Sequence, residues 1–76
     1  MEDLFSTNIN LNNESIVYRV IFDHEKYLFI PGSDDKRFPT FSFKREHDEW
    51  HEQDTLPPDL KKQALEALEK YLLKQH

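Results

Sequence analysis

The chain has 76 residues, the size of one small domain, and its six phenylalanines, three tyrosines and one tryptophan are expected to form most of its core. It contains no cysteine, which excludes disulfides, thiolate zinc sites and thiol nucleophiles. The formal net charge of −5 at pH 7 opposes the attraction to phosphate that supplies most of the affinity for nucleic acid.

The N-terminal segment, residues 1–14, is predicted to be irregular or to form a short strand, because "NINLN" alternates as a strand would. The opening "MEDLFSTNIN" carries acids and lacks the apolar stretch of a secretory signal. No apolar run in the chain approaches the roughly 18 residues that span a bilayer. We therefore expect a soluble, cytoplasmic protein with no membrane contact.

The next segment predicts a β-hairpin. Residues 15–22, "SIVYRVIF", are rich in β-branched and aromatic side chains, and the polar "DHEK" separates them from a second strand at 26–30. If residues 23–26 form the turn, the register pairs Phe22 with Tyr27, Ile21 with Leu28 and Val20 with Phe29. Because side chains alternate between the faces of a strand, both faces of this hairpin are apolar.

A loop and a third strand follow. Residues 31–39, "PGSDDKRFP", contain the only glycine and are predicted to connect two hairpins. A binding role for this loop is the alternative, since long loops in small domains often carry function. Residues 39–45 alternate as a half-buried strand would, with Phe41 and Phe43 on one face.

The stretch "HDEWH" at residues 47–51 resembles the spacing of a zinc-protease motif. On a helix, His47 and His51 would lie one turn apart and could share a metal ion. Asp48 is shorter than the glutamate that serves as general base in those enzymes, and a third ligand would have to come from the remote His24 or His76 or from a carboxylate. We therefore predict no metal site here.

The same stretch is better explained as the turn of a second hairpin. Residues 46–49 would form the turn and residues 50–53 the returning strand, which sets Arg45 opposite Trp50 and allows the guanidinium to stack on the indole. His51 then points away from the face that carries Trp50. A short polar helix is the alternative, although it would have only one apolar residue with which to dock.

The last segment predicts an amphipathic helix over residues 57–75. Pro58 suits the first helical position and Asp59 complements the positive end of the helix dipole. Apolar side chains that recur at helical spacing should pack on the sheet: Leu60, Ala64, Leu65, Ala67, Leu68, Tyr71 and Leu72. Leu73 is expected to be exposed.

Together these elements predict an α+β fold, an antiparallel four-stranded β-meander with a single C-terminal amphipathic helix packed on one face. The side that the helix covers should carry Tyr18, Val20, Phe22, Tyr27, Phe29, Phe41, Phe43 and Trp50. Since one helix covers one face, an apolar patch is left on the opposite side of the first hairpin. This candidate protein contact consists of Val17, Ile21, Leu28 and Ile30.

The sequence suggests two ways in which this patch could be covered. One is the N-terminal segment, through Leu4, Phe5, Ile9 and Leu11, and the other is a partner protein or a second copy in a homodimer. We expect a small non-enzymatic protein-interaction or accessory module with no catalytic, cofactor-binding or metal-binding residues. A nucleic-acid-binding sheet is the alternative, disfavoured by the acidity, and a small metal-dependent enzyme is a distant third.

Overall fold

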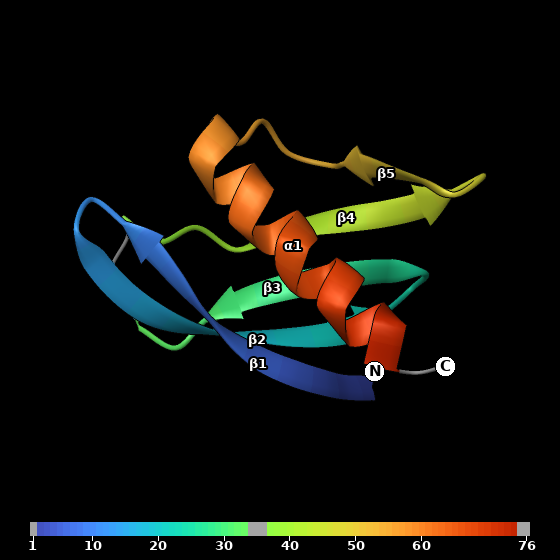
Figure 1. Ribbon diagram of the computed structural model, residues 1–76, viewed down its shortest axis with the longest axis horizontal. Coiled ribbons are helices and arrows are strands. Elements are labelled where there is room, and N and C mark those ends of the chain that lie inside the picture. Colours follow the sequence, from blue (N-terminus) through green and yellow to red (C-terminus); the bar gives the residue numbers. More distant parts are fainter. Residues whose placement is uncertain (1, 34–36, 75–76) are drawn as a thin grey trace.

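Figure 1 shows the computed structural model of the chain, which describes residues 2–33 and 37–74. Within these residues, a five-stranded antiparallel sheet in the order β1-β2-β3-β4-β5 packs against one helix, and the predicted α+β class is confirmed. The elements are β1 (Glu2–Leu11), β2 (Glu14–Asp23), β3 (Lys26–Pro31), β4 (Phe41–Glu46), β5 (Glu49–Glu52) and α1 (Pro58–Lys74). Residues 34–36 of the predicted loop and Gln75 of the predicted helix lie outside the described residues.

The prediction of four strands is wrong, because the N-terminal segment forms β1 at the edge of the sheet. This ten-residue strand pairs with β2 from Leu11 opposite Glu14 to Glu2 opposite Phe22, with a bulge at Leu4. Ile9 faces the helix and is fully buried. The segment therefore extends the sheet at its edge. One of the two alternatives expected it to cover the apolar patch on the opposite face, and it does not.

Two-residue turns join β1 to β2, β2 to β3 and β4 to β5. Both residues of each turn have φ between 51° and 66°, which is the type I′ geometry of tight hairpins: Asn12, Asn13, His24, Glu25, His47 and Asp48. The predicted pairings of Ile21 with Leu28 and of Arg45 with Trp50 are confirmed. The two-residue turns set this register, because the residues that flank such a turn lie opposite each other.

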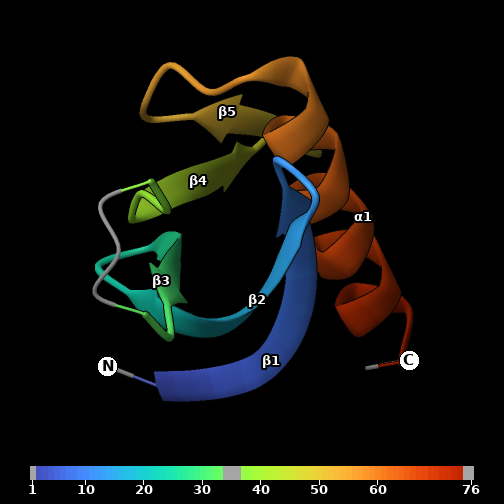
Figure 2. The same cartoon turned by 90° about the vertical axis from the view of Figure 1, so that its left-hand side faces the viewer.

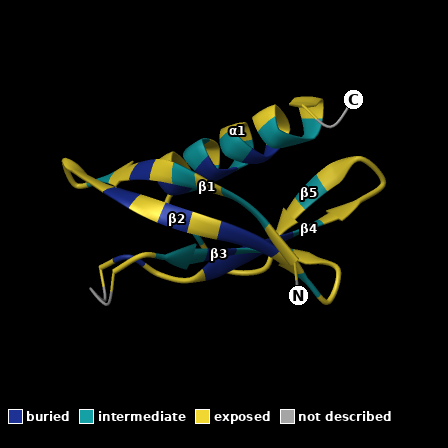
Figure 3. Cartoon of the chain, turned by 90° about the horizontal axis from the view of Figure 1, so that it is seen from below, coloured by how far each residue is buried: buried dark blue, intermediate teal, exposed yellow. Residues whose placement is uncertain are grey.

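The core lies between α1 and the concave side of the sheet, which curves around the helix (Figure 2). Buried and exposed residues alternate along β2, as the period of a strand requires (Figure 3). The predicted helix-side residues Tyr18, Val20, Phe29, Phe41 and Phe43 are buried in this core, and Tyr27 and Trp50 pack against it. Phe22 differs, since 37% of it remains exposed at the end of the hairpin.

The connection between β3 and β4 closes one end of the core. Phe38 is buried there, which the sequence did not predict for a polar loop. The Tyr18 hydroxyl donates a hydrogen bond of 2.9 Å to the carbonyl oxygen of Pro39, and burial raises the pKa of Tyr18 to about 12. This bond satisfies the one polar group of an otherwise apolar side chain.

The helix packs as its apolar stripe predicts. Leu60, Ala64 and Leu68 are fully buried, whereas Leu73 is 71% exposed. Polar contacts also hold β5 to α1, because the indole Nε1–H of Trp50 donates to Glu69 Oε1 at 3.1 Å. The predicted stacking is present too, since Arg45 Cζ lies 5.1 Å from the centre of the Trp50 ring.

Candidate functional site

The predicted contact residues lie on the face of the sheet opposite α1, here called the outer face. Ile21 and Leu28 are directly opposite each other on β2 and β3, and Ile30 is two residues beyond Leu28 on the same side of β3. Leu28 and Ile30 are half-buried, and Val17 is 53% exposed. We call Val17, Leu28 and Ile30 the outer patch.

Ile21 does not belong to the accessible surface, because only 2% of it is exposed. The period of the strand correctly places it on the outer face but says nothing about its burial. Its cross-strand partners are Asp3 on β1 and Leu28 on β3, so it lies between two neighbouring strands in the sheet. Ile21 therefore offers little accessible area to a partner.

Val17 is exposed for a reason that is visible in the backbone. Its carbonyl oxygen accepts a hydrogen bond of 2.9 Å from the N–H of Gly32, the residue beside it across the strand pair. Glycine has no side chain to cover Val17 on that flank. A Cβ built on Gly32 would lie 3.0 Å from Val17 O, so a larger residue there would also crowd the strand.

Charged side chains border the outer patch. Arg19, between Val17 and Ile21 on β2, makes an ion pair with Asp3 on β1, with Nη2 2.6 Å from Oδ1. On β4, Lys44 Nζ lies 3.5 Å from Glu46 Oε1. The apolar residues of the patch therefore have charged residues of both signs beside them, and Arg19 lies directly opposite Ile30.

The structure separates the two histidines of "HDEWH". His47 is the first residue of the β4–β5 turn, and His51 lies on β5 opposite Lys44. The hairpin prediction is confirmed, and the alternative of a polar helix is wrong. Among the described residues, no group of three or more histidine, aspartate and glutamate side chains is arranged to hold a metal ion.

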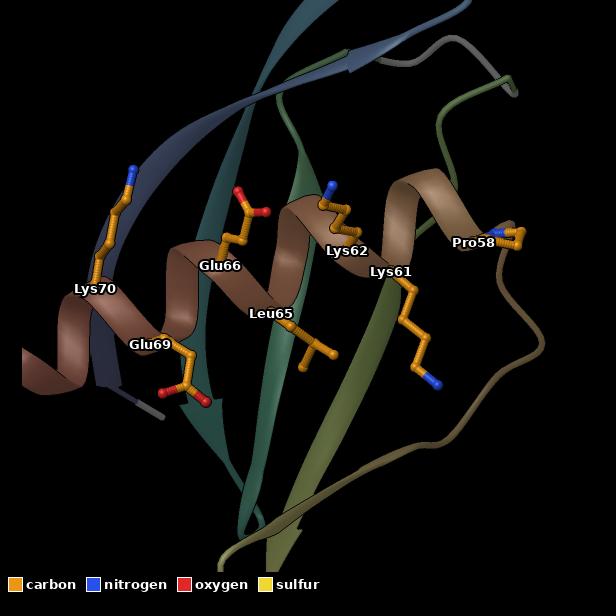
Figure 4. A pocket seen from close by; sticks show the side chains of 7 residues that line it. All are labelled: Pro58, Lys61, Lys62, Leu65, Glu66, Glu69 and Lys70. Atoms are coloured by element: carbon orange, nitrogen blue, oxygen red, sulfur yellow. The ribbon is translucent and has the colours of Figure 1, made fainter.

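A second surface lies on the outward side of α1. Figure 4 shows Leu65, half-buried, between the longer side chains of the helix, with Glu69 on its own side and Glu66 and Lys70 on the side of β1. The residues that line this hollow all come from α1, so no second element brings polar groups toward it. It is a shallow helix surface without the converging groups of a catalytic site.

The exposed aromatic ring of Phe22 borders a third hollow, of about 630 Å³, at the tips of two hairpins. The centre of the Phe22 ring lies 5.0 Å from the centre of the Tyr27 ring. The other residues that line the hollow include cations and anions in similar number: Lys44, Arg45, Glu46, Asp48, Glu25 and His47. The mixed charge is poorly suited to a phosphate backbone, which binds best to a positive surface.

Comparison of the chain with protein-family models, with curated proteins and with solved structures gives no significant match. Among the described residues, α1 does not have the length and apolar character that a membrane-spanning helix needs.

Proposed function

We propose that the protein is a non-enzymatic protein-interaction module whose outer patch forms a symmetric contact with a second copy of the chain. The observation that carries this proposal is the 53% exposure of Val17, which lies diagonally across from the half-buried Ile30 on the face of the sheet opposite α1. An exposed apolar side chain next to further half-buried apolar side chains supplies the desolvated part of a contact, and apolar patches of this kind are candidates for protein–protein interaction.

The borders of the outer patch support a contact between identical copies. In a two-fold interface, the same surface serves both partners, so each charge must find its complement on the other copy. The Arg19–Asp3 and Lys44–Glu46 pairs supply both signs, and an apolar centre with a polar rim is the usual anatomy of an interface.

The nucleic-acid alternative has less support. Most of the aromatic side chains face α1 and are buried or partly buried, so they cannot stack on bases. The exposed ring of Phe22 is bordered by acids as well as by cations. The net charge of −5 opposes binding to phosphate as well.

Sedimentation equilibrium of the wild type and of Val17→Lys tests the proposal. We choose Val17 because it is accessible, whereas a charge at Ile21 would be buried and would destabilise the fold whatever its partner. We expect a dimer for the wild type and a folded monomer for Val17→Lys. Leu73→Lys is the matched control, because Leu73 is exposed on α1, and it should remain dimeric. A wild type that is monomeric at millimolar concentration would contradict the proposal, as would a Val17→Lys variant that still dimerises.

A further inference from the structure

The outer edge of β1 offers unpaired backbone groups. In a hairpin with a two-residue turn, the residues that flank the turn bond to each other, and alternate residues then point their N–H and C=O groups away from the partner strand. Leu11 flanks the turn, so the backbone N–H and C=O groups of Asn10, Asn8 and Ser6 point away from β2. Gln63 bonds both backbone groups of Asn10, which agrees with this direction.

The backbone groups of Ser6 and Asn8 have no such partner. In the described part of the chain, no hydrogen bond engages the N–H or the C=O that either residue directs outward. An edge strand with open groups is a template on which a further strand can form. Because Gln63 bonds to the backbone of Asn10, the open stretch of the edge is limited to the part of β1 before Asn10.

A groove runs between this open edge and α1. It consists of two adjoining hollows of about 370 and 150 Å³, which share Thr7, Ala67 and Lys70. The small side chains of Thr7 and Ala67 leave this space where the strand and the helix face each other. Phe5 and Tyr71 form an apolar wall, with their rings stacked at 4.8 Å between centres. We call this feature the edge groove.

The edge groove is positively charged in an acidic protein. Lys70 and Lys74 line it, against one acid, Glu66. Figure 4 shows Lys70 extending from α1 on the side of β1. In a chain with a net charge of −5, this local excess of one positive charge favours an acidic ligand over a basic one.

We propose that the edge groove binds an extended acidic peptide segment of a partner protein. The segment adds a strand to β1 through the backbone groups of Ser6 and Asn8 and places its carboxylates near Lys70 and Lys74. Its side chains on the inner face contact the helix beside Ala67. Backbone pairing supplies affinity in this mode of recognition, and the side-chain contacts supply selectivity. The site is separate from the outer patch and does not depend on it.

The probe is a capped peptide of alternating glutamate and valine, titrated into the ¹⁵N-labelled full chain, with alternating lysine and valine as the control peptide. We expect the acidic peptide to shift the amide resonances of Ser6 and Asn8 and to slow their hydrogen exchange. Lys70→Glu should weaken binding about tenfold or more, equivalent to about 1.4 kcal/mol, through lost attraction and new repulsion. Lys62→Glu makes the same change of charge on α1 outside the groove and should leave binding unchanged.

A second variant tests the backbone contact. Asn8→Pro removes the outward N–H at an edge position that tolerates proline, and it should abolish peptide binding while Trp50 fluorescence reports an intact fold. Equal binding of the lysine peptide, peptide-induced shifts confined to other surfaces, or no binding at millimolar peptide would overturn the proposal. Protection of Ser6 and Asn8 without peptide at high protein concentration would also overturn it, because a second copy would then occupy the edge. Val17→Lys should bind the peptide as the wild type does, which separates this site from the outer patch.

Discussion

The side-chain amide of Gln63 on α1 makes two hydrogen bonds to the backbone of Asn10 on β1. The N–H of Asn10 donates to Oε1 at 2.8 Å, and Nε2 of Gln63 donates to the carbonyl oxygen of Asn10 at 2.8 Å. The amide thus bonds one residue of an edge strand as a neighbouring strand would. It also fixes the helix to β1 by a directional contact, in addition to the apolar packing of Leu60, Ala64 and Leu68.

Replacement of Gln63 by leucine should destabilise the fold by roughly 1–3 kcal/mol, because it removes two hydrogen bonds from backbone groups and leaves an apolar side chain against them. The amide of Asn10 should then exchange with solvent as fast as those of the open positions Ser6 and Asn8. Hydrogen exchange followed by NMR measures both effects. Unchanged protection of Asn10 in the variant would show that the Gln63 bonds are not what holds this edge.

Leu68→Ala should destabilise the protein by roughly 2–5 kcal/mol, since Leu68 is fully buried and its truncation leaves a cavity in a small core. Leu73→Ala is the matched control, because Leu73 is 71% exposed, and it should change the free energy of unfolding by less than about 0.5 kcal/mol. Urea denaturation measures both values. Similar effects of the two substitutions would contradict the packing of α1 described above.

Glu25→Gly should stabilise the protein by about 1 kcal/mol. Glu25 has φ of 65°, a left-handed conformation that glycine adopts without steric cost and that other L-residues adopt at a cost of roughly 1–2 kcal/mol. Glu25→Ala is the control, because alanine keeps the Cβ and should bring no comparable gain. Thermal denaturation of the three proteins should place the glycine variant highest. Equal stability of the glycine and alanine variants would argue against a type I′ turn.

The stability of the protein should fall as the pH rises through the range in which Tyr18 titrates. Burial raises the pKa of Tyr18 from 10.0 to about 12, so the unfolded chain loses this proton at lower pH than the folded one. The contribution of protonated Tyr18 to the stability of the fold is complete below pH 10 and is lost as the pH rises through 12. Tyr18→Phe should be less stable at neutral pH by about 1 kcal/mol, for the lost bond to Pro39, but should lack this alkaline decline. A parallel decline in both proteins above pH 10 would contradict the assignment.

Both predicted hairpins were found with the correct register because a two-residue turn leaves the flanking residues little choice of partner. The alternation of "SIVYRVIF" and "TFSFKR" then placed the aromatic side chains on one face. β1 was harder to predict, since Asn8 and Asn10 lie within it and asparagine is depleted in strands. Pairing with β2 and contact with α1 outweigh that preference, and neither is visible in the segment alone.

The candidate site was only partly predictable. The period of a strand placed Val17, Ile21, Leu28 and Ile30 on one face, but it could not show that Ile21 is buried while Val17 is exposed beside Gly32. The edge groove had no signal in the sequence. It depends on backbone groups that every residue has and on the closeness of two segments about sixty positions apart, as at Thr7 and Ala67.

A dilution series of the ¹⁵N-labelled wild type, recorded by NMR from millimolar to micromolar concentration, locates any self-association on the molecule. A symmetric contact through the outer patch predicts concentration-dependent shifts at Val17, Leu28 and Ile30, together with Arg19 at the border, and none along the exposed side of α1. Spectra that do not change with concentration would contradict the proposed function. Shifts confined to α1 or to Ser6 and Asn8 would contradict it equally, because they would place the contact on a different surface.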